Sequence, residues 1–175
     1  MRRAERFVVQ VAGPDDAERI GTLLHVSYPT LMPAGYPADV LAGALPLMMR
    51  ANSVLLHSGT YYLAEARDGA LVGCGGWTFE RPGAPGAPID PRLGHIRHFA
   101  THPGWLRHGA GRALFDRCVA DARTAGVQHF ECYASLVAEP FYAALGFAQV
   151  ESSITIDVGP GIDFPCVRMI CHLTG

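Results

Sequence analysis

The sequence has no run of basic residues, no long uninterrupted apolar segment and no C-x-x-C pair of cysteines. Arginines are interspersed with acids, the formal net charge is −2 and the calculated pI is about 6.4, so a nucleic-acid partner is not expected. The longest uncharged stretches, such as residues 40–49, are too short and too interrupted by Gly and Pro to span a bilayer. A membrane partner is therefore not expected either.

The composition predicts one cytoplasmic domain. Residues 1–10 carry charges but no apolar segment of signal-peptide length. The chain of 175 residues, 49% hydrophobic and 17% charged, has the size and composition of a single globular domain, with expected bounds 1–175. The cysteines are odd in number, and we expect reduced side chains that pack in the core: Cys74, Cys118, Cys132, Cys166 and Cys171.

Residues 93–126 predict a strand, a glycine-containing turn and a helix. In the helical part the apolar residues follow the i, i+3, i+4, i+7 spacing of a half-buried helix: Leu114, Phe115, Cys118, Val119, Ala122 and Ala125. Gly126 is a typical helix stop. The other predicted elements can be placed relative to this unit.

The start of that helix has the features of an anion site. The first backbone N–H groups of a helix have no hydrogen-bond partner within the helix. Gly109 and Gly111 allow a ligand to approach the backbone closely. Arg107 and Arg112 add full positive charges to that of the helix dipole. Phosphate or pyrophosphate binding is one reading, and a glycine-softened helix start with two solvated arginines is the other. A P-loop would need Lys-Ser or Lys-Thr after the glycines, and the dinucleotide fingerprint would need glycine at position 114, so neither nucleotide motif fits.

Two motifs resemble those of the GNAT superfamily of N-acetyltransferases. Thr101-His102-Pro103 and the run from Arg107 through Leu114 are similar to its acyl-CoA loop, and residues 141–147, FYAALGF, are similar to its F-Y-x-x-x-G-F segment. The chain differs from the family pattern at Leu106, where Gln or Arg is usual, and it lacks the Asn that often precedes the F-Y pair. The resemblance covers essentially the whole chain and implies acetyl-CoA (coenzyme A) as the cofactor.

The remaining segments predict an α/β (mixed α+β) fold. We expect a strand at 7–11, a helix from Pro14 to near Tyr28-Pro29, a helix at 38–45 with a further turn or helix after Pro46, and an Asp-Gly hairpin joining strands at 60–66 and 70–79. A loop at 81–91, a strand at 127–135, a short helix at 139–145 and two final strands complete the chain. The expected architecture is a single GNAT-type domain with a central mixed, largely antiparallel sheet of about seven strands and helices on both faces.

Residues Gly73, Gly75 and Gly76 in the second hairpin strand indicate a bulge or a close backbone approach.

Four histidines lie close together in the sequence, at 95, 98, 102 and 108. On a helix, three of them would share a face, but the pattern favours a strand, where His95 and His98 would point to opposite faces. No metal site is expected.

The resemblance implies direct transfer of acetyl from acetyl-CoA to a primary amine, on a small molecule or a peptide N-terminus. The segment 28–58 would cover the acceptor, and its only acid is Asp39, so a polycationic acceptor is not indicated. This reaction has three requirements. The acceptor amine must lose a proton to a base, and the departing CoA thiolate needs a proton donor. The thioester carbonyl needs a donor for its developing oxyanion, which a strand N–H around Phe99 to Thr101 would supply. Tyr142, the Tyr of the F-Y pair, is the candidate acid.

His95 is the candidate base, because many family members carry Glu or His there, and Glu80 is its rival. Cys132 has no identifiable base beside it and has little support as a nucleophile. The expected cofactor-binding residues are Phe99, Ala100, Thr101, Arg107, His108, Gly109, Ala110, Gly111, Arg112 and Tyr142. Two rivals stay open: a non-catalytic acyl-CoA sensor or regulatory domain, and a structural domain that binds no cofactor. Similar proteins often extend a sheet across a homodimer through their C-terminal strands, and the sequence leaves the oligomeric state of this chain open.

Overall fold

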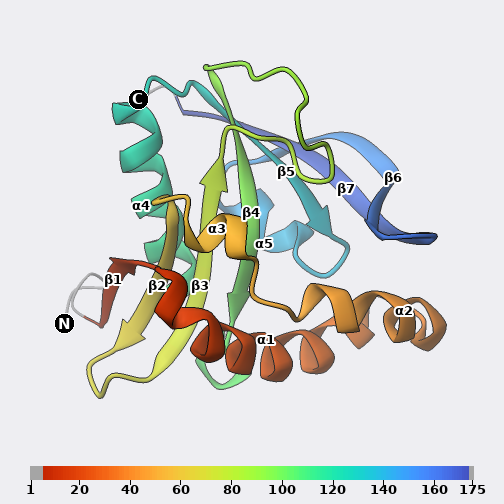
Figure 1. Cartoon of the computed structure of the whole chain (residues 1–175), viewed down its shortest axis with the longest axis horizontal. Helices are drawn as coiled ribbons and strands as arrows, with labels where there is room; N and C mark the ends of the chain where they lie inside the picture. Colours follow the sequence, from red (N-terminus) through yellow and green to blue (C-terminus); the bar gives the residue numbers. More distant parts are fainter. Residues whose placement is uncertain (1–5, 174–175) are drawn as a thin grey trace.

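The structure, a computed structural model, describes residues 6–173, which form a seven-stranded sheet (Figure 1). The strands are β1 (Phe7–Val11), β2 (Tyr61–Ala66), β3 (Leu71–Thr78), β4 (Leu93–Thr101), β5 (His129–Ser135), β6 (Ala148–Gly159) and β7 (Ile162–His172). Their order is β1-β2-β3-β4-β5-β7-β6, and only the β4–β5 pair is parallel in this part of the chain. The expected mixed, largely antiparallel sheet is confirmed. Residues 1–5 and 174–175 of the expected domain lie outside the described residues.

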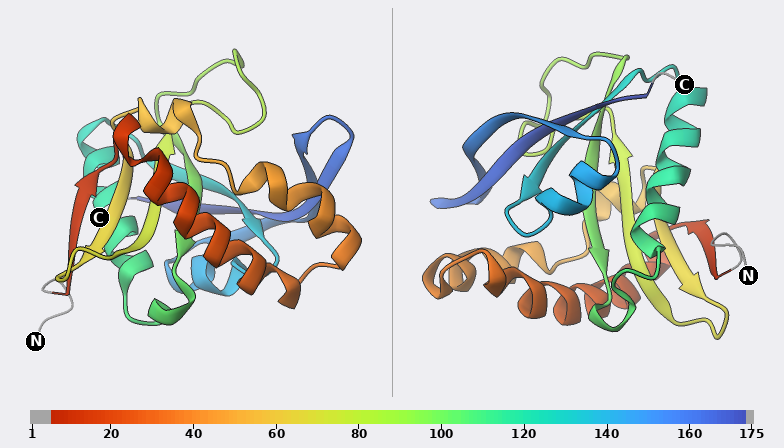
Figure 2. Two further views of the ribbon diagram at one scale, coloured as in Figure 1. Left: turned by 60° about the horizontal axis from the view of Figure 1, so that its bottom comes forward. Right: turned by 180° about the vertical axis from the view of Figure 1, so that it is seen from behind.

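Helices cover both faces of the sheet, as expected (Figures 1 and 2). They are α1 (Ala17–Leu31), α2 (Ala38–Met48), α3 (Ser53–Leu56), α4 (Ala110–Thr124) and α5 (Glu139–Ala144). Residues of α1, α2 and α3 share one core, in which Leu24 packs with Tyr61 and Leu63. Residues of α4 and α5 share the core on the opposite face, around Leu114 and Phe130. The two faces are called here the α1–α2 face and the α4–α5 face.

Two helices extend beyond their expected ends. The first runs through Pro29 to Leu31 rather than stopping at Tyr28-Pro29, and the second runs through Pro46 to Met48. A proline inside a helix removes one backbone hydrogen bond. Burial of Tyr28 and Met32 against the core holds the last turn of α1 in place despite that loss. Tertiary packing therefore overrides the local stop signal.

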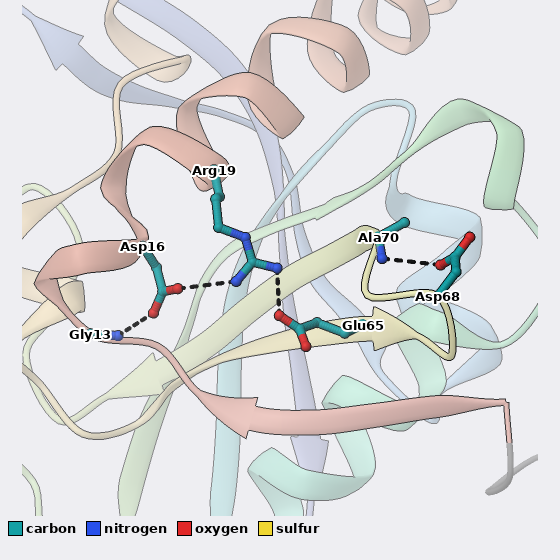
Figure 3. A network of polar contacts seen from close by, with 6 residues as sticks. All are labelled: Gly13, Asp16, Arg19, Glu65, Asp68 and Ala70. Carbon is teal, nitrogen blue, oxygen red and sulfur yellow. Dashed lines mark hydrogen bonds and ion pairs between the residues drawn. The ribbon is translucent and has the colours of Figure 1, made fainter.

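The start of α1 is tied to the sheet by the polar network in Figure 3. The Asp16 carboxylate accepts a hydrogen bond of 2.8 Å from the Gly13 N–H. Arg19 pairs with that carboxylate at 3.3 Å and also with Glu65 on β2. These contacts fix the direction in which α1 crosses the sheet, and this direction brings Tyr28 to the site described below.

The expected Asp-Gly hairpin joins β2 and β3. Gly69 has φ +84°, a left-handed conformation that glycine adopts readily, and the Asp68 carboxylate accepts a hydrogen bond of 3.1 Å from the Ala70 N–H (Figure 3). β2 and β3 pair antiparallel from this turn onward. The hairpin prediction is confirmed.

A bulge interrupts the pairing of β3 with β4. Cys74 pairs with Ala100 and Gly76 pairs with Arg97, so two residues of β4 lie opposite the single residue Gly75. One of the two is His98, whose φ is +53°. A left-handed conformation in a non-glycine residue is costly and is concentrated at functional sites. The bulge expected near these glycines is confirmed.

The segment Ala38–Leu56 is long and apolar enough, by length and composition alone, to cross a membrane, and 22% of it is buried. It consists of α2 and α3, with residues 49–52 between them. Leu41, Ala44 and Leu55 belong to the core on the α1–α2 face. Length and composition are therefore weak evidence for a membrane span in this segment.

Candidate active site

A cavity of about 900 Å³ lies where β4 and β5 separate. These strands pair only through residues 93–95 and 129–131, and they diverge beyond that point. Side chains from both faces of the sheet line the cavity, among them Phe99, Cys132 and Tyr142 on the α4–α5 face and Tyr28, Met48 and Arg97 on the α1–α2 face. Two molecules can therefore approach β4 from opposite faces and meet in the gap.

The start of α4 has the geometry of an anion site. Gly109 precedes the helix with φ +97°, and Arg107 is also left-handed, with φ +63°. Within residues 6–173, the backbone N–H groups of residues 109–112 have no hydrogen-bond partner. Free N–H groups at a helix N-terminus, beside exposed Arg107 and Arg112, suit a pyrophosphate. The residues present therefore fit the phosphate end of coenzyme A.

Gly111 has a packing role that the sequence did not indicate. A Cβ atom at this position would lie 2.8 Å from two ring atoms of Phe141. The glycine thus allows α5 to pack against the first turn of α4, and the space beside it is filled by protein rather than open to a ligand. This contact joins the two motifs that carry the resemblance.

Tyr142 lines the cavity from α5. Its ring packs against those of Phe99, Phe141 and Phe147, with centroid separations of 6.2, 5.1 and 5.4 Å. Burial raises the pKa of Tyr142 well above its ordinary value, so the phenol keeps its proton. The hydroxyl makes no hydrogen bond within the described residues, so its O–H is available to a molecule in the cavity.

The edge of β4 that faces the gap carries free donors. The Tyr28 hydroxyl donates to the Phe99 carbonyl at 3.2 Å, and the Ser27 hydroxyl donates to the Thr101 carbonyl at 2.8 Å. In a strand, the N–H of a residue points to the same edge as its carbonyl. The N–H groups of Phe99 and Thr101 therefore point to the edge that β5 leaves uncovered, where an oxyanion donor was expected.

The two expected base candidates lie outside the cavity wall. His95 is buried on the α1–α2 face, with Nδ1 3.3 Å from Oε1 of Glu131. The other oxygen of Glu131 accepts a hydrogen bond of 2.7 Å from Nε of Arg168. Glu80 follows β3 and is exposed. The structure therefore does not bring His95 or Glu80 together with Tyr142.

Sequence reasoning did not single out two residues of β4 that do line the cavity, Arg97 and His98. The expectation that His95 and His98 point to opposite faces is wrong, because the bulge shifts the alternation of side chains by one residue. His98 Nε2 lies 2.8 Å from the Met48 carbonyl, and its ring lies 5.7 Å from that of Tyr28. The glycines of β3 indicated a bulge, but the position of the bulge depends on how β3 pairs with β4.

The imidazole of His98 is in the state that a base requires. A carbonyl only accepts, so Nε2 carries the proton that is donated to Met48, and Nδ1 is unprotonated in the neutral ring. Burial lowers the pKa of His98 below its ordinary 6.5, and the nearby charge of Arg97 lowers it further, while the hydrogen bond to Met48 opposes the shift without cancelling it. The ring is therefore neutral near pH 7.

All five cysteines are free and buried, which confirms the expectation of reduced packing residues. Cys132 lines the cavity, and burial raises its thiol pKa, so it is protonated and a poor nucleophile at neutral pH. Residues 6–173 contain no group of three or more His, Cys, Asp or Glu side chains placed to hold a metal ion.

Glu131 is expected to stabilise the fold in a pH-dependent way. Burial alone would raise its pKa, but the adjacent imidazole of His95 and the hydrogen bond from Arg168 outweigh burial and lower it to about 2. We expect Glu131→Gln to lower the free energy of unfolding at pH 7 by about 2–3 kcal/mol. Because the pKa is lower in the folded than in the unfolded chain, this contribution is complete above about pH 4.5 and is lost as the pH falls towards 2.

Urea unfolding of both proteins from pH 7 down to pH 2 measures this difference. The matched control is Glu65→Gln, which removes a carboxylate from the more exposed pair with Arg19 and is expected to cost less than about 1 kcal/mol. A gap between native protein and Glu131→Gln that stays constant down to pH 2 contradicts the assignment.

Comparison with known proteins identifies the class. Residues 47–164 match the family described as acetyltransferase (GNAT) domain. The chain therefore belongs to the GNAT acetyltransferase family, and it is an acyltransferase whose cofactor is acetyl-CoA. The sequence comparison with curated proteins found no match.

Solved structures show the same fold at low sequence identity. A GCN5-related N-acetyltransferase from Rhodopseudomonas palustris is 18% identical, with a TM-score of 0.71 and 96% of each chain covered. The PaiA N-acetyltransferase from Thermoplasma acidophilum, solved with coenzyme A, is 14% identical with a TM-score of 0.69, covering 95% of this chain and 98% of that one. Rv2747 from Mycobacterium tuberculosis, solved with CoA and the ligand NLQ, is 24% identical with a TM-score of 0.62, covering 95% and 99%.

Proposed function

We propose that this protein transfers acetyl from acetyl-CoA directly to the primary amine of a small molecule or a peptide N-terminus. The observation that carries the proposal is the cavity at the β4–β5 gap, which is lined from both faces of the sheet and has Tyr142 and His98 in its wall. A donor can enter along α4 and an acceptor along α1 and α2. Among the described residues the cavity wall is rich in apolar side chains and includes only two acids, Glu151 and Asp157, which does not suit a polycationic acceptor.

Acetyl-CoA binding is proposed at the start of α4 and along β4. The N–H groups of residues 109–112 would hold the pyrophosphate, with Arg107, His108 and Arg112 around it. The free edge of β4 at residues 99–101 would donate N–H groups to the acetyl carbonyl. When bound, acetyl-CoA would supply an acetyl thioester, and the transfer forms an N–C bond and breaks the C–S bond. Of the two protons that a protonated amine gives up, one ends on the CoA thiol and one is released through the base.

Tyr142 is proposed to act on the sulfur side of the reaction. Its hydroxyl is unpaired and protonated, so it can donate a hydrogen bond to a developing thiolate. A phenol whose pKa lies well above 10 does not readily surrender its proton to a thiolate with a pKa near ~8.5. Stabilisation of the thiolate by this hydrogen bond is therefore its main contribution.

His98 is the base that the geometry favours. An amine with a pKa near ~10 is only about one part in a thousand neutral at pH 7, so a group in the cavity must accept its proton. His98 lines the cavity with an unprotonated Nδ1, whereas His95 faces Glu131 and Glu80 is exposed. His95 and Glu80 stay as alternatives that act through water.

An assay of CoA thiol release tests the function and the cofactor loop together. We expect acetyl-CoA and a panel of small primary amines to give amine-dependent thiol release, and Arg112→Glu to raise the KM for acetyl-CoA about tenfold with kcat retained. The substitution removes the hydrogen bond from Arg112 to the Ala144 carbonyl, but it places an acid in the first turn of α4, where it favours the helix. The Tm of the variant without cofactor shows whether its fold is retained.

Arg117→Glu is the matched control, on the same helix and with the same charge change. It breaks the pair of Arg117 with Asp121, so it is expected to lower stability slightly and to leave the KM unchanged. Saturating acetyl-CoA should also raise Tm by about 5–10 °C. Binding without release on any amine would instead support an acyl-CoA sensor, and an absence of binding would contradict the cofactor loop.

Two broader points belong to the same proposal. The five buried free thiols fit a reducing compartment, which supports a cytoplasmic location. Strand β6 lies at the end of the sheet, and residues 148–153 are exposed. A free edge of this kind is a surface on which a second copy could pair in a homodimer.

A further inference from the structure

Arg97 is a half-buried cation without an anionic partner. Its Nη1 donates a hydrogen bond of 2.8 Å to the Thr78 hydroxyl, and it forms no ion pair within the described residues. Glu80 is the acid whose charge reaches Arg97, and the two are not in contact. Burial lowers the pKa of Arg97, which reflects the cost of holding a charge away from water. Such a group gains stability when an anion binds to it.

The other charges in the cavity wall do not compensate Arg97. Arg168 is already paired with the buried carboxylate of Glu131. Arg50 and Arg81 lie at the exposed rim, where Arg81 stacks over the Tyr133 ring at 5.5 Å. The two acids of the wall, Glu151 and Asp157, are exposed on β6. The interior on this side of the sheet therefore has an excess of positive charge.

Arg97 lies on the acceptor side of the sheet and not on the side of the CoA loop. It pairs with Gly76, two residues from Cys74, which is packed in the core of the α1–α2 face. Its neighbour Ile96 points the other way, into the core with α4. The start of α4 lies on that opposite face, so its anion site and Arg97 serve different groups.

Apolar side chains line the same cavity as Arg97. They come from the turn after α1, from α2, from α3 and from β6: Met32, Leu47, Met48, Leu55, Ile154 and Ile156. An acceptor that fills this space needs an apolar body as well as an anionic group. A single interior guanidinium matches a carboxylate, with one charge and a planar pair of oxygens, better than a doubly charged phosphate.

We propose that the acceptor is a small apolar amine that also carries a carboxylate, such as an α-amino acid with an apolar side chain, and that Arg97 binds this carboxylate. The inference rests on the proposed function, because it names the substrate class for the same cavity. Binding at Arg97 would hold the amine beside the bulge of β4, next to His98.

Matched pairs of ligands test the proposal on the native protein. Leucine, methionine and phenylalanine are each compared with their amides by calorimetric titration into protein saturated with CoA, and by thiol release with acetyl-CoA. We expect at least one acid to bind about 10- to 100-fold more tightly than its amide, the range of a charge-assisted hydrogen bond. Equal binding within every pair, or tighter binding of phosphoethanolamine than of all three acids, overturns the proposal.

Arg97→Gln assigns the effect to the residue, because glutamine can still donate to Thr78. It should remove the preference for the acid and leave binding of the amide unchanged, whereas Arg92→Gln, at an exposed position outside the cavity, should change neither. If Arg97→Gln does not fold, Arg97→Lys keeps the charge without the planar fork and should lose most of the preference. An acid preference that survives substitution of Arg97 overturns its assignment.

The same measurements separate this inference from the proposed function. If the acids bind preferentially but are not acetylated, the carboxylate site is supported and acetylation of these amines is ruled out. If the amides are acetylated as fast as the acids, the acetyltransferase activity is supported and the carboxylate site is ruled out.

Discussion

Replacing Tyr142 with phenylalanine is expected to lower kcat about 10²- to 10³-fold while leaving the affinity for CoA within about twofold. The substitution removes one O–H group from a residue that lines the cavity, and this O–H makes no hydrogen bond within residues 6–173. A donor of this kind acts on charge that develops during the reaction, and its loss is worth several kcal/mol in the transition state. The ring stays packed among its three aromatic neighbours, so the free energy of unfolding should change by less than about 0.5 kcal/mol.

Tyr62→Phe is the matched control. Its phenol is also largely buried, on β2, but it donates to the Asp121 carboxylate at 2.7 Å and does not line the cavity. This variant should lose about 1 kcal/mol of stability and retain its kcat. Steady-state kinetics and thermal unfolding of both variants give the comparison. A Tyr142→Phe enzyme with native kcat rules out a role for the hydroxyl.

Replacing His98 with glutamine is expected to lower kcat/KM about 10²-fold at pH 7. The glutamine amide can reproduce the donation to the Met48 carbonyl, so the bulge of β4 keeps its support while the basic nitrogen is lost. Activity requires the neutral imidazole, so kcat/KM of the native enzyme should rise with pH as His98 loses its proton. Because burial lowers this pKa, the rise should level off below pH 6.5. In the variant kcat/KM should instead keep rising towards the amine pKa near ~10, because only the neutral amine then reacts.

Parallel pH profiles of His95→Gln and Glu80→Gln decide between the three base candidates. Neither side chain lines the cavity, so both variants should keep a profile that levels off below pH 6.5. If the profile no longer levels off in His95→Gln but still does so in His98→Gln, the base is His95. If the same change is seen in Glu80→Gln instead, the base is Glu80, in the loop after β3.

Features that depend on nearby residues could be predicted from the sequence. The spacing of apolar residues after Gly111 located α4, and the Asp-Gly pair located the β2–β3 turn. The glycine and arginine pattern at 107–112 located the start of α4, whose free N–H groups are a property of any helix start. The prolines of α1 and α2 indicated helix ends that the structure does not have, because packing of the last turns outweighs a single lost hydrogen bond.

The sequence could not predict which side chains of β4 reach the cavity. Strand alternation predicted opposite faces for His95 and His98, and the bulge opposite Gly75 changed that relation. Its position depends on the register between β3 and β4, which is set by packing across the whole sheet. For the same reason, nothing in the spacing distinguished Arg97 as the cation without a carboxylate.

By itself, the sequence determined the elements, their order and the chemistry available at the two motifs, because these follow from periodicity, turns and side-chain type over a few residues. The tertiary structure decided which groups meet. His95 is buried against Glu131, and His98 and Tyr142 line the same cavity. The ring of Phe141 packs against Gly111, where a larger residue would clash with it. These outcomes depend on strand register and on contacts between residues far apart in the chain, which local patterns do not encode.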